Sequence, residues 1–100
     1  MTKTKKEVHD YIIKYIKDNG GEFTKWYVGI AEDVKDRLFT QHKVDEKNSL
    51  WVYSKADSAD DARAVEKSII DNYKTKGDTG GGSDKTKYVY AYKITNDTEE

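Results

Sequence analysis

The chain has 100 residues, 37% of them charged, and carries a formal net charge of −1 at pH 7. This length predicts one domain over residues 1–100, and the balanced charge lacks the general basic excess of many nucleic-acid-binding proteins. The absence of cysteine excludes disulfides, thiolate metal sites and a cysteine nucleophile, and no apolar run reaches the length of a membrane span. We therefore expect a soluble, cytoplasmic protein with no membrane partner.

An amphipathic helix is the first predicted element, over residues 4–19. Gly20 and Gly21 follow it, and glycine is typical of a helix end. Apolar residues recur within the segment at helical spacing, so one face of the helix should pack on the core. The side chains predicted on that face are Val8, Tyr11, Ile12, Tyr15 and Ile16.

The next predicted element is a strand over residues 23–30, where aromatic and β-branched residues alternate with others. Alternation places side chains on opposite faces of a sheet. The two predicted faces carry Trp26, Val28 and Ile30 on one side and Lys25, Tyr27 and Gly29 on the other.

A short helix and a second strand should follow. Asp33 can cap a helix that runs to about residue 42, with Val34, Leu38 and Phe39 packed inward and Arg37 one turn after Val34. Residues 50–55 have the composition of a strand.

The helix predicted over residues 59–74, capped by Ser58, contains an acidic residue within its apolar stripe. Glu66 lies one turn after Ala62 and before Ile69, so its carboxylate should point toward the domain interior. Burial of an unpaired carboxylate is costly, so a cation, several hydrogen-bond donors or a metal ion should face it. An internal ion pair and a functional carboxylate both fit this pattern.

Residues 77–83 hold four glycines and should form a loop, and residues 87–94 alternate like a strand. Tyr88, Tyr90, Tyr92 and Ile94 share one face of that strand. The segment 95–100 is polar and acidic, and it is expected to fray. The order α-β-α-β-α-β predicts a small α/β fold with a three-stranded, mainly antiparallel sheet flanked by helices.

Several residues together resemble the GIY-YIG nuclease superfamily. They are the run Tyr27-Val28-Gly29, Arg37 eight residues after that glycine, the strand at 50–55, and Glu66 on the next helix. The resemblance implies a compact GIY-YIG-like α/β domain that hydrolyses DNA phosphodiester bonds with one Mg²⁺ or Mn²⁺ ion.

The resemblance also implies roles for individual residues. Tyr27 would help to activate the attacking water, Arg37 would neutralise the scissile phosphate, and Glu66 would bind the metal ion. Gly29 would let the backbone approach the substrate, with Lys25 and His42 as further substrate contacts. Specificity for DNA would come from a protein partner or from the shape of the substrate.

The chain departs from the family pattern in three places. The usual Gly-Ile-Tyr strand is missing upstream, and we hypothesise that the strand at 87–94 replaces it by permutation, with Tyr90 or Tyr92 as the second tyrosine. His42 comes one residue later than the family histidine, and helical rotation would turn it away from the site, as a surface or capping group. No asparagine matches in residues 77–84, so a degenerate site is also compatible with the sequence.

Aromatic residues support an alternative function without catalysis. Such residues can stack on nucleic-acid bases or contact a partner protein. The same residues can instead be a sheet face packed under helices, which is the more common arrangement of such a set. The set comprises Trp26, Trp51, Tyr53, Tyr88, Tyr90 and Tyr92.

Overall fold

The computed structural model describes residues 3–77 and 84–99. The predicted loop at 77–83 therefore lies almost wholly outside the described residues. The described elements, in chain order, are α1 (Lys5–Asp18), η1 (Phe23–Lys25), β1 (Trp26–Ala31), η2 (Asp36–Gln41), β2 (Trp51–Lys55), α2 (Ala59–Tyr73) and β3 (Tyr88–Lys93). The predicted small α/β fold, with a three-stranded antiparallel sheet and flanking helices, is confirmed.

The last strand in the sequence occupies the centre of the sheet. The strand order is β1-β3-β2, and β3 pairs antiparallel with both neighbours. Gly29 of β1 and Tyr53 of β2 both lie opposite Tyr90 of β3. The predicted pairing of the C-terminal strand with the strand that contains Tyr27 is thus confirmed. The outer edge of β1 is covered in part, because Lys76 forms a parallel bridge with Tyr27.

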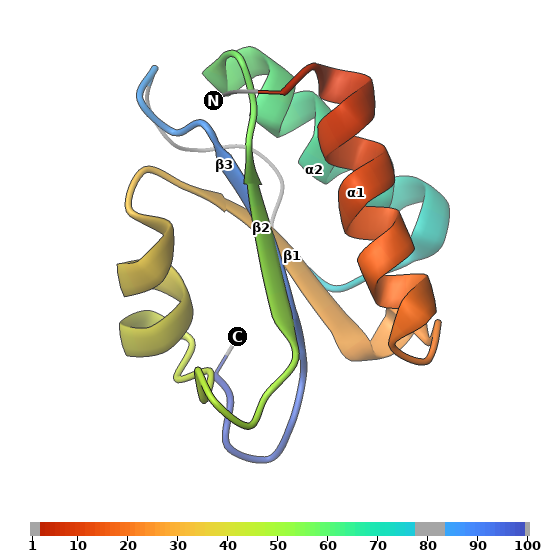
Figure 1. Cartoon of the computed structure of the whole chain (residues 1–100), viewed down its shortest axis with the longest axis vertical. Coiled ribbons are helices and arrows are strands. Elements are labelled where there is room, and N and C mark those ends of the chain that lie inside the picture. Colours follow the sequence, from red (N-terminus) through yellow and green to blue (C-terminus); the bar gives the residue numbers. More distant parts are fainter. Residues whose placement is uncertain (1–2, 78–83, 100) are drawn as a thin grey trace.

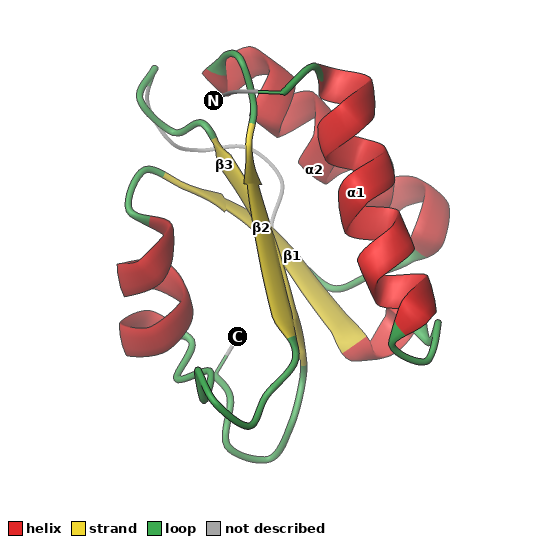
Figure 2. Ribbon diagram, viewed as in Figure 1, coloured by secondary structure: helices red, strands yellow, loops and turns green. Residues whose placement is uncertain are grey.

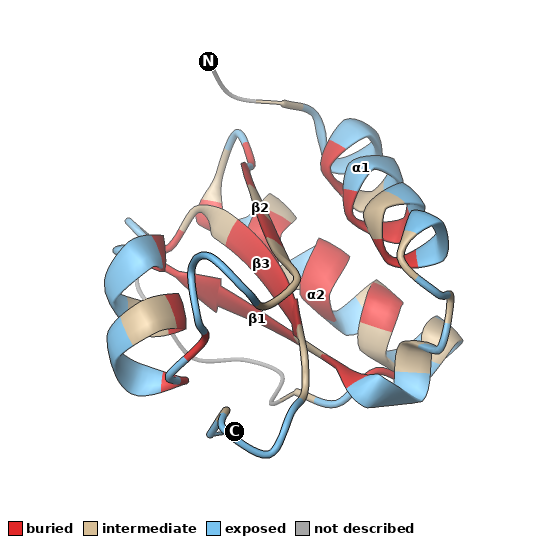
Figure 3. Cartoon of the chain, turned by 60° about the horizontal axis from the view of Figure 1, so that its bottom comes forward, coloured by how far each residue is buried: buried red, intermediate tan, exposed pale blue. Residues whose placement is uncertain are grey.

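Helices cover both faces of this sheet (Figures 1 and 2). On one face α1 and α2 bury a core of aliphatic residues together with Trp26, and on the other η2 packs over the tyrosines of β3. Colouring by burial shows the buried strands between these two layers (Figure 3). The alternation predicted for Trp26, Val28 and Ile30 against Tyr27 and Gly29 matches these two faces.

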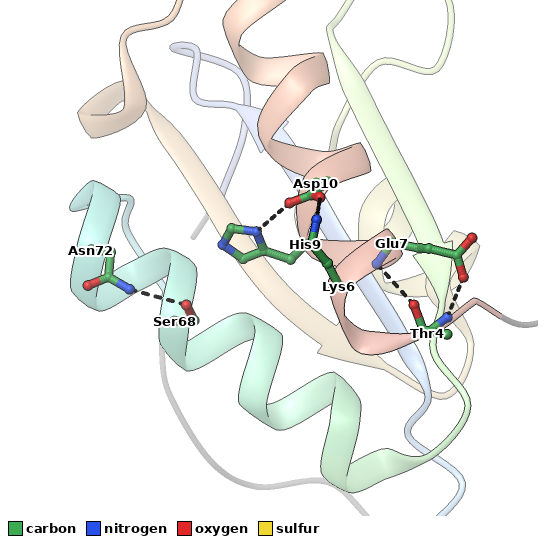
Figure 4. Close-up of polar contacts among 7 residues, drawn as sticks. All are labelled: Thr4, Lys6, Glu7, His9, Asp10, Ser68 and Asn72. Atoms are coloured by element: carbon green, nitrogen blue, oxygen red, sulfur yellow. Dashed lines mark hydrogen bonds and ion pairs between the residues drawn. The ribbon is translucent and has the colours of Figure 1, made fainter.

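Local sequence signals account for the ends of α1. Thr4 and Glu7 form a capping box, in which each side chain bonds the main-chain N–H of the other (Figure 4). At the other end Gly21 N–H bonds the carbonyl of Ile16 at 2.9 Å, with Gly21 at a positive φ of 73°. One inward position was predicted wrongly. Tyr11 is 44% exposed, with the ammonium of Lys3 over its ring, and Ile13 is buried instead. The buried face of α1 therefore includes the Ile13 side of the helix and not the Tyr11 side.

The first strand begins three residues later in the structure than predicted. Residues 23–25 form the short 3₁₀ helix η1, and the strand starts at Trp26. Lys25 is therefore not a strand residue, and its ammonium pairs with Glu22 at 2.8 Å on the surface.

The C-terminal segment was predicted to fray, and this is wrong for the described residues. Thr95 and Thr98 form a compact turn in which the Thr95 N–H bonds the Thr98 hydroxyl at 3.0 Å. Beyond the turn, the Glu99 N–H donates to the carbonyl of His42 at 2.7 Å. Main-chain bonds to the body of the protein thus hold a segment that has little apolar surface to bury.

Gly29 is required by the position of Tyr90. A Cβ atom at residue 29 would lie 2.5 Å from the Tyr90 hydroxyl oxygen and 2.6 Å from the ring carbon that bears it. Tyr90 is 1% exposed, so its ring has little freedom to move away. The absence of a side chain at Gly29 lets the Tyr90 ring cross over β1.

We expect Gly29→Ala to lower the free energy of unfolding by about 1–3 kcal/mol, the usual cost of overpacking a core. Urea denaturation followed by circular dichroism would measure it. The matched control is the same substitution in a Tyr90→Leu background, where the obstructing ring end is gone and the added cost should fall below about 0.5 kcal/mol. An equal cost in both backgrounds would show that Tyr90 is not the reason for the glycine.

Candidate functional site

Four aromatic side chains meet where β1, β3 and the end of η2 come together. We name Tyr27, His42, Tyr90 and Tyr92 the tyrosine–histidine cluster. The Tyr27 ring stacks on Tyr92 with 5.3 Å between centroids, and it contacts the His42 ring at 4.7 Å. His42 in turn contacts Tyr92 at 4.9 Å. Of the four, Tyr27 is half-buried and the rest are buried.

His42 reaches this cluster because η2 is wound as a π-helix. The His42 N–H bonds the carbonyl of Arg37, five residues earlier, at 2.9 Å. The wider turn brings His42 nearly over Arg37, whereas α-helical rotation would turn it away. His42 is the C-cap residue of η2, so the capping position is confirmed, but the prediction of a surface group is wrong, because His42 is buried and faces the sheet.

The hydrogen bonds of His42 identify which ring nitrogen carries the proton. Its Nδ1 lies 2.6 Å from the main-chain carbonyl oxygen of Glu99, and a carbonyl can only accept. Nδ1 therefore donates, and in the neutral ring Nε2 is left as an acceptor. The Tyr90 hydroxyl, 2.6 Å from Nε2, is then the donor of the second bond.

Tyr90 is held in its neutral, proton-bearing form. Burial raises the pKa of Tyr90 well above its ordinary value of 10.0, and interaction with Tyr27 raises it further. The Arg37 guanidinium acts in the opposite direction, through its charge and a hydrogen bond, while the charge of Glu66 raises the pKa. Arg37 and Glu66 thus both act on the Tyr90 hydroxyl, although they come from η2 and α2.

Glu66 is 1% exposed on α2, so the predicted inward orientation is confirmed. Arg37 is half-buried at the start of η2. Of the predicted site residues, Tyr27 and Tyr90 are in ring contact, and the charges of Arg37 and Glu66 both influence the pKa of Tyr90.

Only some of the other predicted substrate contacts lie at the cluster. Gly29 borders the cluster through Tyr90, and His42 is a full member. Lys25 is not brought to the cluster, because its side chain pairs with Glu22 in η1. The main-chain carbonyl of Glu99 was missed, and the sequence holds no signal for it, because a main-chain group carries no residue-type preference. Tyr92 was predicted as a possible second tyrosine, and it shares a strand face with Tyr90 because side chains two residues apart point the same way.

The predicted aromatic platform is smaller than its sequence suggested. Trp26 is fully buried on the other face of the sheet, and Tyr90 and Tyr92 are buried under η2. Trp51, Tyr53 and Tyr88 are half-buried and form the accessible part. Trp51 and Tyr53 stack nearly parallel, at 4° and 6.1 Å between centroids, and Tyr88 meets Tyr53 edge-on.

Glu66 is the carboxylate predicted to hold a divalent ion. Among the described residues no group of three or more His, Cys, Asp or Glu side chains could hold a metal ion. Mg²⁺ does not require such a group, because it keeps several waters and takes oxygen ligands from a substrate phosphate. The hard oxygen donor of Glu66, with the phenols of the cluster nearby, fits Mg²⁺ or Mn²⁺ better than a softer metal.

Within the described part of the chain, every helix is too short or too polar to cross a membrane. Comparisons with protein families, curated protein sequences and solved structures found no match to this chain.

The pKa of Tyr90 predicts a specific loss of stability at high pH. Above pH about 10 the unfolded chain releases the Tyr90 proton while the folded chain keeps it, so the unfolded state binds fewer protons. Stability should then fall as pH rises, by up to about 1.4 kcal/mol per pH unit from this group.

Denaturation at pH 9 to 11 would measure this slope. Tyr90→Phe should flatten it, whereas Tyr11→Phe, at an exposed tyrosine, should leave it unchanged. The same slope in wild type and Tyr90→Phe would contradict the raised pKa.

Proposed function

We propose that this chain is a divergent GIY-YIG nuclease that hydrolyses DNA phosphodiester bonds with one Mg²⁺ or Mn²⁺ ion. The observation that carries the proposal is the buried Tyr90 hydroxyl, 2.6 Å from Nε2 of His42 and beside the Tyr27 ring, with the buried Glu66 on α2 and the half-buried Arg37 on η2. A guanidinium, a carboxylate and two phenols come from four separate elements to one region. The pairing of β3 with β1 supports the permutation, in which β3 replaces the strand that the family has upstream.

Arg37 and Glu66 supply the charge that phosphoryl transfer requires. The half-buried guanidinium of Arg37 is planar and presents donors that match two phosphate oxygens. Glu66 would hold the metal ion, which when bound supplies Lewis-acid stabilisation of the negative phosphoryl oxygens. Both charges act on a transition state whose negative charge is spread over the equatorial oxygens.

The tyrosine–histidine cluster would accept the proton that the attacking water loses. Tyr27, which is half-buried and therefore partly accessible to solvent, would orient the water. Tyr90 takes a proton from the water as it passes its own proton to Nε2 of His42, so a free phenolate is never formed. The water oxygen becomes the nucleophile, and His42 ends as a cation with both nitrogens protonated. Because Tyr90 is buried, the side chains in front of it must shift when DNA binds.

Selection of DNA must depend on local contacts. The chain has a net charge of −1, so general attraction to the phosphate backbone is weak. A protein partner, or the shape of a branched or nicked substrate, would then supply specificity.

We expect purified protein to nick or cleave branched DNA when Mg²⁺ or Mn²⁺ is present, and not in a chelator. Glu66→Gln and Arg37→Ala should each lower the single-turnover rate by about 100-fold or more, because each removes charge stabilisation of the transition state. Gel assays of labelled substrates would measure the rates. Glu46→Gln, which removes an exposed carboxylate, is the control and should keep the wild-type rate.

A second measurement separates metal binding from cleavage. Titration of Mg²⁺ into labelled protein, followed by two-dimensional NMR, should shift signals of Glu66 and its neighbours in wild type but not in Glu66→Gln. An absence of both localised shifts and cleavage on branched, nicked and linear DNA would defeat the proposal.

A noncatalytic interaction module is the second candidate, and the accessible aromatic row favours it. Trp51 stacks on Tyr53, and Phe39 of η2 contacts Trp51 edge-on at 5.0 Å. The Lys55 ammonium lies 5.7 Å from the centre of the Tyr88 ring, which adds a positive charge to the row. Such a surface can stack on unpaired bases.

If the row binds single-stranded DNA, Trp51→Ala should weaken binding about 5- to 160-fold, the equivalent of about 1–3 kcal/mol per stacked base. Fluorescence anisotropy with a labelled oligonucleotide would measure the affinity. Glu66→Gln should not weaken it, which separates a stacking surface from a catalytic one. Equal affinities of wild type and Trp51→Ala would exclude the row as the binding site.

A further inference from the structure

The described chain ends against His42 through two hydrogen bonds to one residue. The Glu99 N–H donates to the His42 carbonyl at 2.7 Å, and the His42 Nδ1–H donates to the Glu99 carbonyl at 2.6 Å. The hydroxyl of Tyr92 also donates to that carbonyl, at 3.3 Å. Main-chain atoms of Glu99 thus contact both the backbone and the imidazole of His42.

The segment before Glu99 is shaped to make this contact. The Ile94 N–H bonds the Lys25 carbonyl at 2.8 Å, which fixes the end of the segment nearest β3. The turn at Thr95 and Thr98 then reverses the chain, and in Figure 1 the segment after β3 loops back toward the end of η2. The Glu99 side chain is exposed, so its main chain and not its carboxylate makes the contact.

We propose that the Glu99 carbonyl is a positioning group that selects the Nδ1–H form of His42 and so makes Nε2 the acceptor of the Tyr90 proton. An imidazole donates from one nitrogen and accepts at the other, and the bond at Nδ1 decides which is which. With the proton on Nε2 instead, Nε2 would donate toward Tyr90 and could not receive its proton. The catalytic consequence rests on the proposed nuclease function, but the selection of the tautomer does not.

The tyrosines described around His42 do not fix its tautomer, including Tyr92, whose hydroxyl lies 3.1 Å from Nδ1. Tyr27 contacts its ring face from β1, and Tyr90 and Tyr92 contact it from β3. A tyrosine hydroxyl can donate or accept, so it accommodates either tautomer. The charges of Arg37 on η2 and Glu66 on α2 both influence the pKa of Tyr90. The Glu99 carbonyl contacts the ring only as an acceptor.

The test compares Glu99→Pro with Glu99→Ala in the full chain. Proline lacks the N–H that holds residue 99 to the His42 carbonyl, whereas alanine keeps it. Nitrogen-15 chemical shifts of the imidazole, recorded at a pH where the ring is neutral, report which nitrogen carries the proton. His9, on α1 beside Asp10 and remote from Glu99 in sequence, serves as an internal reference (Figure 4).

We expect the Nδ1–H form for His42 in wild type and Glu99→Ala, and a shift toward the Nε2–H form in Glu99→Pro. Thr98→Val, which removes the hydroxyl that closes the turn, should shift the tautomer in the same direction while keeping every main-chain N–H. If the chain cleaves DNA, Glu99→Pro should lower the rate about tenfold or more, with Glu99→Ala unchanged.

The outcomes separate the two proposals. An Nε2–H form in wild type, or an unchanged Nδ1–H form in both Glu99→Pro and Thr98→Val, overturns the role of Glu99. The expected tautomer changes without cleavage by any variant support the role of Glu99 and count against the nuclease function. Circular dichroism and the unchanged signals of His9 would show that the variants are folded.

Discussion

The contact of Tyr90 with Gly29 and His42 is the constraint on which the rest of the site depends. Tyr90 lies on the central strand, so its ring can reach its partners only by crossing β1, and only a glycine leaves room for it. Once there, its buried hydroxyl needs a hydrogen-bond partner, because an unsatisfied polar group in the interior is costly. His42 is that partner, and its burial in turn requires an acceptor for Nδ1, which Glu99 provides.

Much of the fold could be predicted because it depends on local patterns. The 3.6-residue spacing, the glycines after α1 and the cap of Ser58 defined the two long helices, and alternation defined the faces of β1 and β3. The errors arose where a local pattern fits two arrangements. Tyr11 is amphipathic and can border either flank of a helix, and residues 23–25 have strand composition but close a 3₁₀ turn.

The site was predictable only in part, for two physical reasons. Tyr27, Arg37 and Glu66 could be proposed from residue type and spacing, because a buried carboxylate within an apolar stripe is unusual. His42 was proposed as a substrate contact, but its buried position against the sheet was not predicted, because the prediction assumed 3.6 residues per turn and the chain winds η2 as a π-helix. Glu99 could not be predicted, because its contact uses main-chain atoms and joins residues 57 apart in the sequence.

The direction of hydrogen-bond donation distinguishes a network that only stabilises the fold from a network that can also transfer a proton. Buried tyrosines and a histidine stabilise a fold with either direction of donation, since each group needs only some partner. Here the carbonyl of Glu99 can only accept, so in the neutral ring two bonds run one way, from the Tyr90 hydroxyl to Nε2 and from Nδ1 to the carbonyl. The open end of this path is the oxygen of Tyr90, on which Arg37 and Glu66 both act. An acceptor for a proton therefore lies behind a hydroxyl that both charges influence, and the proposed hydrolysis would use this arrangement to remove a proton from the attacking water.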